Sequence, residues 1–317
     1  MFGFILKFQA FIEQLRKKKA LWFTTLTVAA SLGIVVTMYY LTTMTSRSAQ
    51  GMYEATHSSY TYELDNKIDD TVKKLQIASN LLLENQGFVG AISGANANAA
   101  LKQASAAISG VDKGEIVIEL YTQNGTRVAS SSDKAKINQV LESKGLQKAI
   151  TANATVTGIE YEDGAVYVRV INPTEKGTYL EVKKNIDFLA DVYNNDEKIF
   201  QVLLDKDLLD MKKLQEYKST KVGKAYLSVQ SKSSDMFLEN IAELDFDKLI
   251  ANRYMLTNNY FVAAKPIMDV NGAKVGVLLV GEDIMKDKSL PKMTKSISNG
   301  ITTAALGLVV ALLVLMV

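Results

Sequence analysis

The sequence holds few side chains that could carry out a reaction. It has one histidine, His57, and no cysteine, so a Ser-His-Asp triad depends on His57 alone and no thiolate site can form. No glycine-rich phosphate-binding loop is present. Carboxylate pairs such as Asp69-Asp70 and Glu282-Asp283 are expected to be solvated ends of elements. These observations predict a protein that is not an enzyme, has no cofactor and holds no metal.

Arg169 is the centre of the most specific binding chemistry in the sequence. Alternation along a strand places Tyr167 and Arg169 on the face of the segment 165–171 that is opposite its valines. The same alternation places Tyr121 and Tyr179 on the polar faces of their own strands. A guanidinium surrounded by tyrosines suits a small carboxylate, because its planar fork donates two parallel hydrogen bonds. We therefore predict a ligand-binding site made of Tyr121, Tyr167, Arg169, Tyr179 and Asp187.

A ligand-free alternative fits the same pattern. In it the polar face of the sheet is exposed, and Arg169 forms ion pairs with Glu181 and Glu119. Under either interpretation Arg169 points away from the aliphatic side of its sheet, so an Arg169→Ala variant is expected to fold. The sequence does not choose between the two.

Small antiparallel sheets must position these residues. Strand signals cover 115–121, 126–130, 159–162, 165–171 and 178–183, with tight turns at Asn124-Gly125 and Asp163-Gly164. A helix is predicted over 137–151 and a longer helical segment over 187–217. A second strand set covers 224–230, 260–265 and 274–280, with a turn at Asn271-Gly272. Pro173 and Pro266 each close a strand before a turn, which indicates two sheets built to one plan.

A long helix precedes the sheets. Residues 45–85 contain no proline, and apolar or small residues repeat with heptad spacing at Leu64, Ile68, Thr71, Leu75, Ala78 and Leu82. This seam can contact a second copy of the chain, the domain behind it, or both, and it predicts a homodimer. His57 is expected to be a packing or surface residue.

Two charge-free apolar runs bracket the chain. Residues 20–44 are long enough to cross a bilayer, which takes roughly 20 apolar residues of helix. Arg16–Lys19 precede them, and such basic flanks stay in the cytoplasm. Residues 297–317 form the second predicted transmembrane helix. The N-terminus is thus expected in the cytoplasm and residues 45–296 outside it. A cleaved signal peptide is the alternative for the first run, and the second span disfavours it.

The overall charge excludes one class of partner. Lys and Arg number 36 against 34 Asp and Glu, so the net charge of +2 gives no basic field for nucleic acid.

The predicted organisation is an amphipathic cytoplasmic tail on membrane lipid (1–19), a transmembrane helix (20–44), a stalk helix with a small-residue segment (45–110), a membrane-distal module (111–187), a linker helix with a membrane-proximal module (188–290) and a second transmembrane helix (297–317).

The order of these parts resembles the double Cache (dCache) sensory domain. Residues 260–284, YFVAAKPIMDVNGAKVGVLLVGEDI, are similar to the usual Cache ending of strand, proline, Asn-Gly turn and strand. The resemblance covers roughly residues 45–290. It implies an α+β fold with a long N-terminal helix and two PAS-like antiparallel-sheet modules, flanked by two transmembrane helices.

The resemblance also implies a function. Such domains are the extracytoplasmic ligand-sensing parts of bacterial plasma-membrane receptors, which bind a small molecule in the distal module and signal by helix displacement. Chemotaxis receptors are the first expectation, followed by sensor kinases and cyclases. The cytoplasmic signalling module of those families is absent from this sequence, which is expected to be the sensory half. Amino-acid-binding members carry a Trp shortly after an Arg. The only Trp here is Trp22, within the first predicted span, so that motif is absent and an amino-acid ligand is not implied. The alternative is a membrane-anchored structural or interaction protein of the envelope.

Overall fold

The structure is a computed structural model. It describes residues 7–8, 10–11, 13, 19–112, 114–162, 164–195, 198–208, 219–230, 232–286 and 290–316. These form two compact units, Thr56–Met285 and Met1–Ala55 with Lys286–Val317. Most of the predicted amphipathic tail, residues 1–19, lies outside the described residues.

The unit Met1–Ala55 with Lys286–Val317 is helical over both predicted spans. It contains the first part of α2 (Lys19–Glu84) and all of α10 (Leu290–Met316). None of the helices, over the residues described in them, is both long enough and apolar enough to cross a membrane. The two transmembrane helices therefore stay a prediction.

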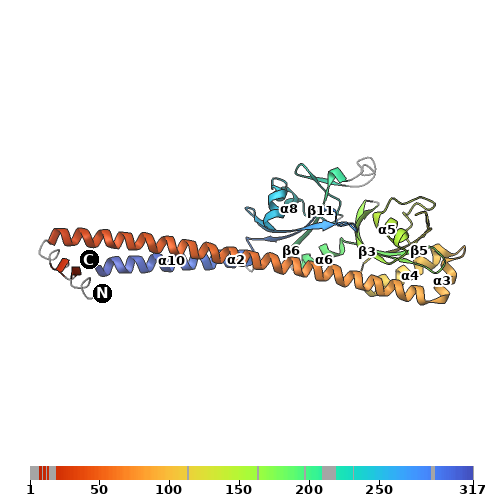
Figure 1. Cartoon of the computed structure of the whole chain (residues 1–317), viewed down its shortest axis with the longest axis horizontal. Helices are drawn as coiled ribbons and strands as arrows, with labels where there is room; N and C mark the ends of the chain where they lie inside the picture. Colours follow the sequence, from red (N-terminus) through yellow and green to blue (C-terminus); the bar gives the residue numbers. More distant parts are fainter. Residues whose placement is uncertain are drawn as a thin grey trace. The chain divides into compact units, whose positions relative to one another are not determined.

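The unit Thr56–Met285 contains two antiparallel sheets (Figure 1). The first has the strand order β2-β1-β5-β4-β3, and the second has the order β7-β8-β6-β11-β10-β9. In each sheet the last strand in sequence lies beside the first, as one shared plan predicts. The two orders differ elsewhere, because β8 lies between β6 and β7 in the second sheet. The strands are β1 (Ile116–Tyr121), β2 (Arg127–Ser130), β3 (Val156–Glu162), β4 (Ala165–Pro173), β5 (Tyr179–Asn185), β6 (Lys198–Asp205), β7 (Thr220–Val222), β8 (Tyr226–Ser228), β9 (Tyr254–Leu256), β10 (Tyr260–Met268) and β11 (Lys274–Asp283).

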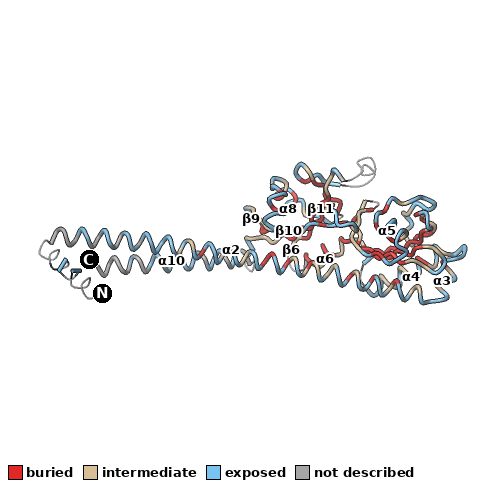
Figure 2. Tube along the Cα trace, in the orientation of Figure 1, coloured by how far each residue is buried: buried red, intermediate tan, exposed pale blue. Residues whose placement is uncertain are grey.

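Short helices cover the sheets, and Figure 2 shows the buried residues gathered there. On one face of the first sheet, Leu146 and Ala149 of α5 pack with Tyr121, Ile171 and Tyr179. On the second sheet, α8 and α9 contribute Phe237 and Leu249 to an apolar core. The remaining described elements are α3 (Gln86–Ile92), α4 (Ala97–Asp112), α5 (Lys144–Ala152), α6 (Phe188–Asn195), the 3-10 turn η1 (Lys206–Leu208), α8 (Asp235–Ile241) and α9 (Phe246–Asn252).

The predicted seam of α2 faces its own domain. Leu64 and Leu75 are each 1% exposed. Asn172, on the aliphatic side of the first sheet, donates to Ser79 Oγ at 2.8 Å. The seam therefore packs against the sheets of its own chain, and the homodimer stays a prediction. His57 is buried as a packing residue, with its Nε2 3.4 Å from the Ala264 carbonyl oxygen.

Two predicted helices are wrong in part. The helix predicted over 137–151 begins only at Lys144, because Ser143 caps it by accepting a hydrogen bond from the Leu146 amide. The helical segment predicted over 187–217 contains α6, but residues 198–205 form β6 in the centre of the second sheet. Its apolar residues are buried on both faces of that sheet, so they do not alternate with polar ones. Residues 209–218 lie outside the described residues.

The strand predicted to end at Pro266 continues past it to Met268. β9 pairs with β10 only as far as Ala263, so β10 is an edge strand at Pro266. A proline, which lacks an amide hydrogen, is tolerated at such an edge.

The close approach of β11 to β6 gives a stability prediction. A Cβ on Gly276 would lie 2.3 Å from the Leu203 carbonyl oxygen, and backbone cannot move aside cheaply. We expect Gly276→Ala to lower the free energy of unfolding by about 1–3 kcal/mol, measured by denaturant unfolding of the purified chain. A Cβ on Gly110 of α4 meets nothing within 4 Å, so Gly110→Ala is the matched control and should not destabilise. Equal effects of the two substitutions would contradict the packing.

Candidate functional site

A network of buried ionisable side chains fills the α5 side of the first sheet. Arg169 and Glu181 are both 0% exposed, and the other strand residues of the network are nearly as buried except Glu160, whose side chain is 13% exposed. The network consists of Glu119, Arg127, Glu160, Glu162, Arg169, Glu181 and Lys183. The predicted site face is thus neither an open pocket nor an exposed surface.

Strand pairing sets the geometry of this network. Glu119 lies directly opposite Glu181, and Arg169 lies directly opposite Lys183. Like charges opposite one another are destabilising. Each is compensated across the diagonal, because Arg169 Nε lies 2.9 Å from Glu181 Oε1 and Lys183 Nζ lies 2.6 Å from Glu119 Oε2. The result is an open chain of alternating charges, Glu119–Lys183–Glu181–Arg169, held by three adjacent strands.

The guanidinium of Arg169 is occupied by carboxylates of its own chain. Its Nη1 donates to Glu160 Oε2 and to Ser143 Oγ, both at 2.8 Å. Its Nη2 donates to Glu162. The Arg169–Glu181 pair of the ligand-free alternative is present but buried, whereas Glu119 pairs with Arg127 and Lys183. A ligand carboxylate would have to displace at least one of these internal partners.

Two predicted tyrosines belong to the same network. Tyr121 donates to Glu119 at 2.5 Å and to Glu181 at 3.1 Å. The ring of Tyr167 lies under the ammonium of Lys183, which is 5.0 Å from its centroid. Both tyrosines therefore support the charge network in this structure.

The other two predicted site residues lie apart from Arg169. The Tyr179 hydroxyl faces the end of α5, 3.4 Å from the Ile150 carbonyl oxygen. Asp187 lines a separate charged cavity of about 690 Å³ beside α2, with Lys67 and Lys74. Sequence reasoning placed Tyr121, Tyr167 and Arg169 together correctly but missed Glu160 and Glu162 of β3. A ligand role for the predicted set stays a prediction.

The network shifts the pKa values of its members. Burial raises the pKa of Glu162, but Lys183 and Arg169 outweigh it and bring the value to about 2. Burial dominates at Glu181 and raises the pKa of that carboxyl despite the neighbouring Arg169 and Lys183. The carboxylates of the network outnumber its cations. Protonation of Glu181 reduces this excess negative charge, which agrees with the raised pKa of its carboxyl.

Glu119, Glu162 and Glu181 are also a candidate metal-binding group. Their carboxylate oxygens lie within 4.8 Å of one another. The Lys183 ammonium already sits between them, 2.6 Å from Glu119 and 2.5 Å from Glu162. A divalent cation would be repelled by this ammonium, so these residues do not fit a metal ion.

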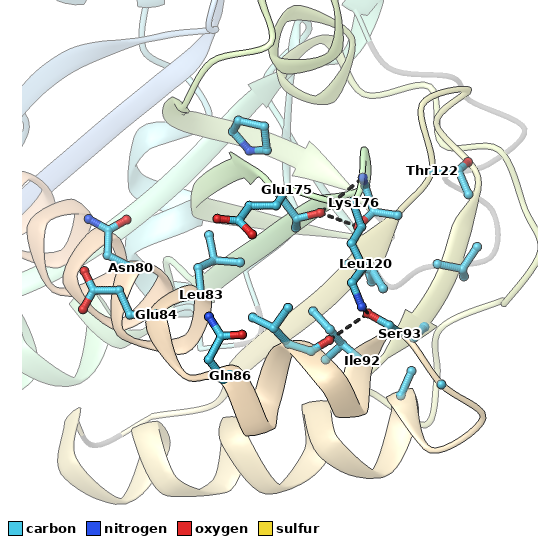
Figure 3. Close-up of a pocket in the computed structure, with 18 residues that line it drawn as sticks. Asn80, Leu83, Glu84, Gln86, Ile92, Ser93, Leu120, Thr122, Glu175 and Lys176 are labelled. Atoms are coloured by element: carbon cyan, nitrogen blue, oxygen red, sulfur yellow. Dashed lines mark hydrogen bonds between the residues drawn. The ribbon is translucent and has the colours of Figure 1, made fainter.

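A second concavity opens on the opposite side of the first sheet, where α2 ends. This cavity has a volume of about 680 Å³. Figure 3 shows its lining: Asn80, Leu83 and Glu84 from α2, Ile92 and Ser93 at the end of α3, Leu120 from β1, and Glu175 and Lys176 from the β4–β5 turn. Sequence reasoning missed it because these residues are far apart in the chain. The feature of the sequence that could have pointed to this cavity is the small-residue segment after α2, whose Gly94 and Ala97 line it.

The fold defines a class of architecture. Two antiparallel sheets follow one long N-terminal helix, as the resemblance to double Cache domains implies. The solved structures that the chain is similar to include the extracellular domain of a protein described as a histidine kinase, the sensory domain of a chemoreceptor and a periplasmic domain.

Three of these structures illustrate the likeness. The extracellular domain of a protein described as a histidine kinase, vpHK1S-Z8, is 11% identical, with 78% of this chain and 96% of that one covered and a TM-score of 0.44. The sensory domain of the Campylobacter jejuni chemoreceptor Tlp3 is 13% identical, with 81% and 99% covered and a TM-score of 0.34. The periplasmic domain of Vibrio cholerae LuxQ is 9% identical, with 76% and 99% covered and a TM-score of 0.36. No family model and no curated protein matches the chain. The likeness to these structures does not identify any functional residue of this chain.

The charge network gives a prediction that reverses the sequence-based one for Arg169. Removing one partner of a buried ion pair costs about 3–5 kcal/mol, because the remaining charges stay buried and uncompensated. We expect Arg169→Ala to lower the free energy of unfolding by that amount, measured by urea denaturation. Lys102 pairs with Asp133 on the surface, so Lys102→Ala is the control and should cost less than about 1 kcal/mol. A parent-like Arg169→Ala would show that the network does not hold the module together.

Glu162 and Glu181 predict opposite dependences of stability on pH. The pKa of folded Glu162, about 2, lies below its ordinary 4.5, so its stabilisation is present above pH 4.5 and is lost as the pH falls towards 2. The raised pKa of Glu181 adds stability at low pH that is lost as the pH rises through the folded value.

Variants separate these two contributions. The urea concentration at the unfolding midpoint is measured between about pH 3 and pH 8. In Glu162→Gln this midpoint should fall less on acidification than in the parent, and in Glu181→Gln it should fall less as the pH is raised. Unchanged slopes in both variants would contradict the assignment of the two shifts.

Proposed function

We propose that this chain is the extracytoplasmic ligand-sensing part of a membrane signalling receptor. Residues 20–44 and 297–317 cross the membrane in this proposal, with the N-terminus in the cytoplasm and the unit Thr56–Met285 outside. The receptor acts as a homodimer of the chemotaxis type, or of the kinase or cyclase type. The ligand is a small molecule that binds in the first sheet module.

The observation that carries the proposal is the cavity whose wall is the end of α2. Its volume of about 680 Å³ lies within the range of roughly 300–1,000 Å³ typical of small-molecule sites. Asn80, Leu83 and Glu84 line it, and α2 is helical from these residues back to Lys19. A molecule that binds there touches the helix directly. It can shift α2 only by the difference in its affinity for the two helix positions, typically about 1–3 kcal/mol.

A second route runs from the first sheet module to the second. Glu160 accepts hydrogen bonds from the amides of Lys144 and Gly145 at the start of α5, and it also holds Arg169. The Lys144 ammonium lies 2.8 Å from Asp269 Oδ2 in the β10–β11 turn. Lys148 donates to the carbonyl oxygen of Val270 at 2.7 Å. A change in the first module therefore reaches the strands that precede α10 in sequence.

A fusion with a reporter kinase tests the proposal. The chain is joined after Val317 to the cytoplasmic part of a membrane histidine kinase, and transcription from its target promoter is measured. We expect the double variant Lys144→Ala/Lys148→Ala to change the basal output about fivefold or more, because it cuts the link between the modules. Lys102→Ala, on the surface of the first module, should match the parent. A fusion without kinase output, or a double variant identical to the parent, would favour a structural role in the envelope.

A further inference from the structure

The floor of the cavity at the end of α2 is apolar. Ile92, Leu120 and Ala129 are 5%, 4% and 1% exposed, and Leu83 and Val89 extend the same surface. Apolar area removed from water contributes about 25 cal/mol per Å², so this floor favours a hydrocarbon body.

The rim of the cavity carries carboxylates. Figure 3 shows Glu175 extending from the β4–β5 turn towards the end of α2, where Glu84 and Asn80 lie. Neither Glu84 nor Glu175 has a hydrogen-bond or ion-pair partner within the described part of the chain. Both acceptors are therefore available to a molecule in the cavity.

The cationic side chain of the lining, Lys176, forms its hydrogen bond at the other end of the cavity. Lys176 Nζ donates to Ser93 Oγ at 2.8 Å, and the Ser93 hydroxyl donates to the Val89 carbonyl oxygen at 2.7 Å. The hydroxyls of Thr174 and Thr178 are bonded to each other at 2.8 Å. The hydroxyls are satisfied internally. Lys176 keeps its positive charge because Ser93 is neutral, so the lining carries two carboxylates and one ammonium and has a net charge of −1.

The end of α2 adds to the negative potential. Glu84 is the last residue of this helix, and its last turn contains no basic residue. A helix C-terminus carries a partial charge of about −0.5, which repels a carboxylate and attracts a cation. A positive charge at this rim would compensate both Glu84 and the helix end.

We propose that this cavity binds a small cation with an apolar body, of which a primary alkylamine is the simplest example. The ammonium lies between Glu84 and Glu175, and the hydrocarbon lies on Leu120 and its neighbours. This inference rests on the ligand-sensing function proposed above and supplies its ligand class. It also places the ligand on the side of the sheet opposite Arg169.

Three probes of equal chain length test the ligand class. Hexylamine, hexan-1-ol and hexanoate are titrated calorimetrically into the full chain in lipid nanodiscs. We expect hexylamine to bind in a one-to-one ratio and the other two at least about tenfold more weakly, because only the amine matches the rim. Equal binding of the three, or tighter binding of hexanoate, would overturn the proposal.

Variants locate the binding. Glu84→Gln and Glu175→Gln should each weaken hexylamine binding about three- to tenfold, with an unchanged unfolding midpoint because both residues are on the surface. Glu243→Gln, exposed on the second module, is the matched control and should bind like the parent. Ala97→Phe fills the cavity and should abolish binding. Parent-like binding in both rim variants and in Ala97→Phe would place the amine elsewhere and refute the site.

The two proposals fail separately. If hexylamine does not bind while Lys144→Ala/Lys148→Ala still changes the output of the kinase fusion, the ligand class is wrong and the sensory function stands. If hexylamine binds as predicted but neither it nor the double variant changes that output, the site stands and the sensory function is wrong.

Discussion

The buried chain of alternating charges is the constraint on which the first module depends. Glu119, Glu181, Arg169 and Lys183 compensate one another only when β1, β5 and β4 keep their present register. A slip of one residue in β5 would move Glu181 and Lys183 to the aliphatic face, and Arg169 would lose Glu181 while keeping Glu160 and Glu162 of β3. An unpaired buried charge costs several kcal/mol, so the network acts against every wrong pairing. Its main contribution is thus to the specificity of the sheet, since a well-packed apolar core could match its stability.

The same network decides which side of the first sheet can take a ligand. The α5 side is filled, because Arg169 holds Glu160 and Glu160 in turn holds the first amides of α5. A ligand on that side would have to separate buried carboxylates from their cations, which costs free energy because the separated charges stay buried. The cavity on the other side needs no such rearrangement. Residues at the end of α2 form part of its wall.

The sequence predicted the parts of this structure that are local. Turns at Asn124-Gly125 and Asn271-Gly272 join β1 to β2 and β10 to β11, and alternation placed Arg169 on the correct face. The ligand-free alternative named Glu181 as a partner of Arg169 correctly. It did not find the partners on β3, because a face pattern does not say which strand lies next to β4. Glu160 and Glu162 enter through β3, and the predicted strand included both without giving its neighbour. β6 was missed because a strand buried on both faces has the composition of a buried helix. The cavity was missed because four separate segments build it.

Both sheets are antiparallel, but they differ in what fills the helix-covered face. In the second module this face is apolar, with Leu203, Val262 and Phe237 in one cluster. Apolar packing is dense and non-directional, so it resists deformation without responding to charge. The ionic core of the first module responds to protons and to displaced partners. The contact between the modules joins these two kinds of core, because Val270 of the second module packs beside Gly158 of β3, where a Cβ would lie 2.7 Å from Val270. The ionic core of the first module and the apolar core of the second therefore belong to modules that meet at a close contact, which leaves no room for a side chain at Gly158.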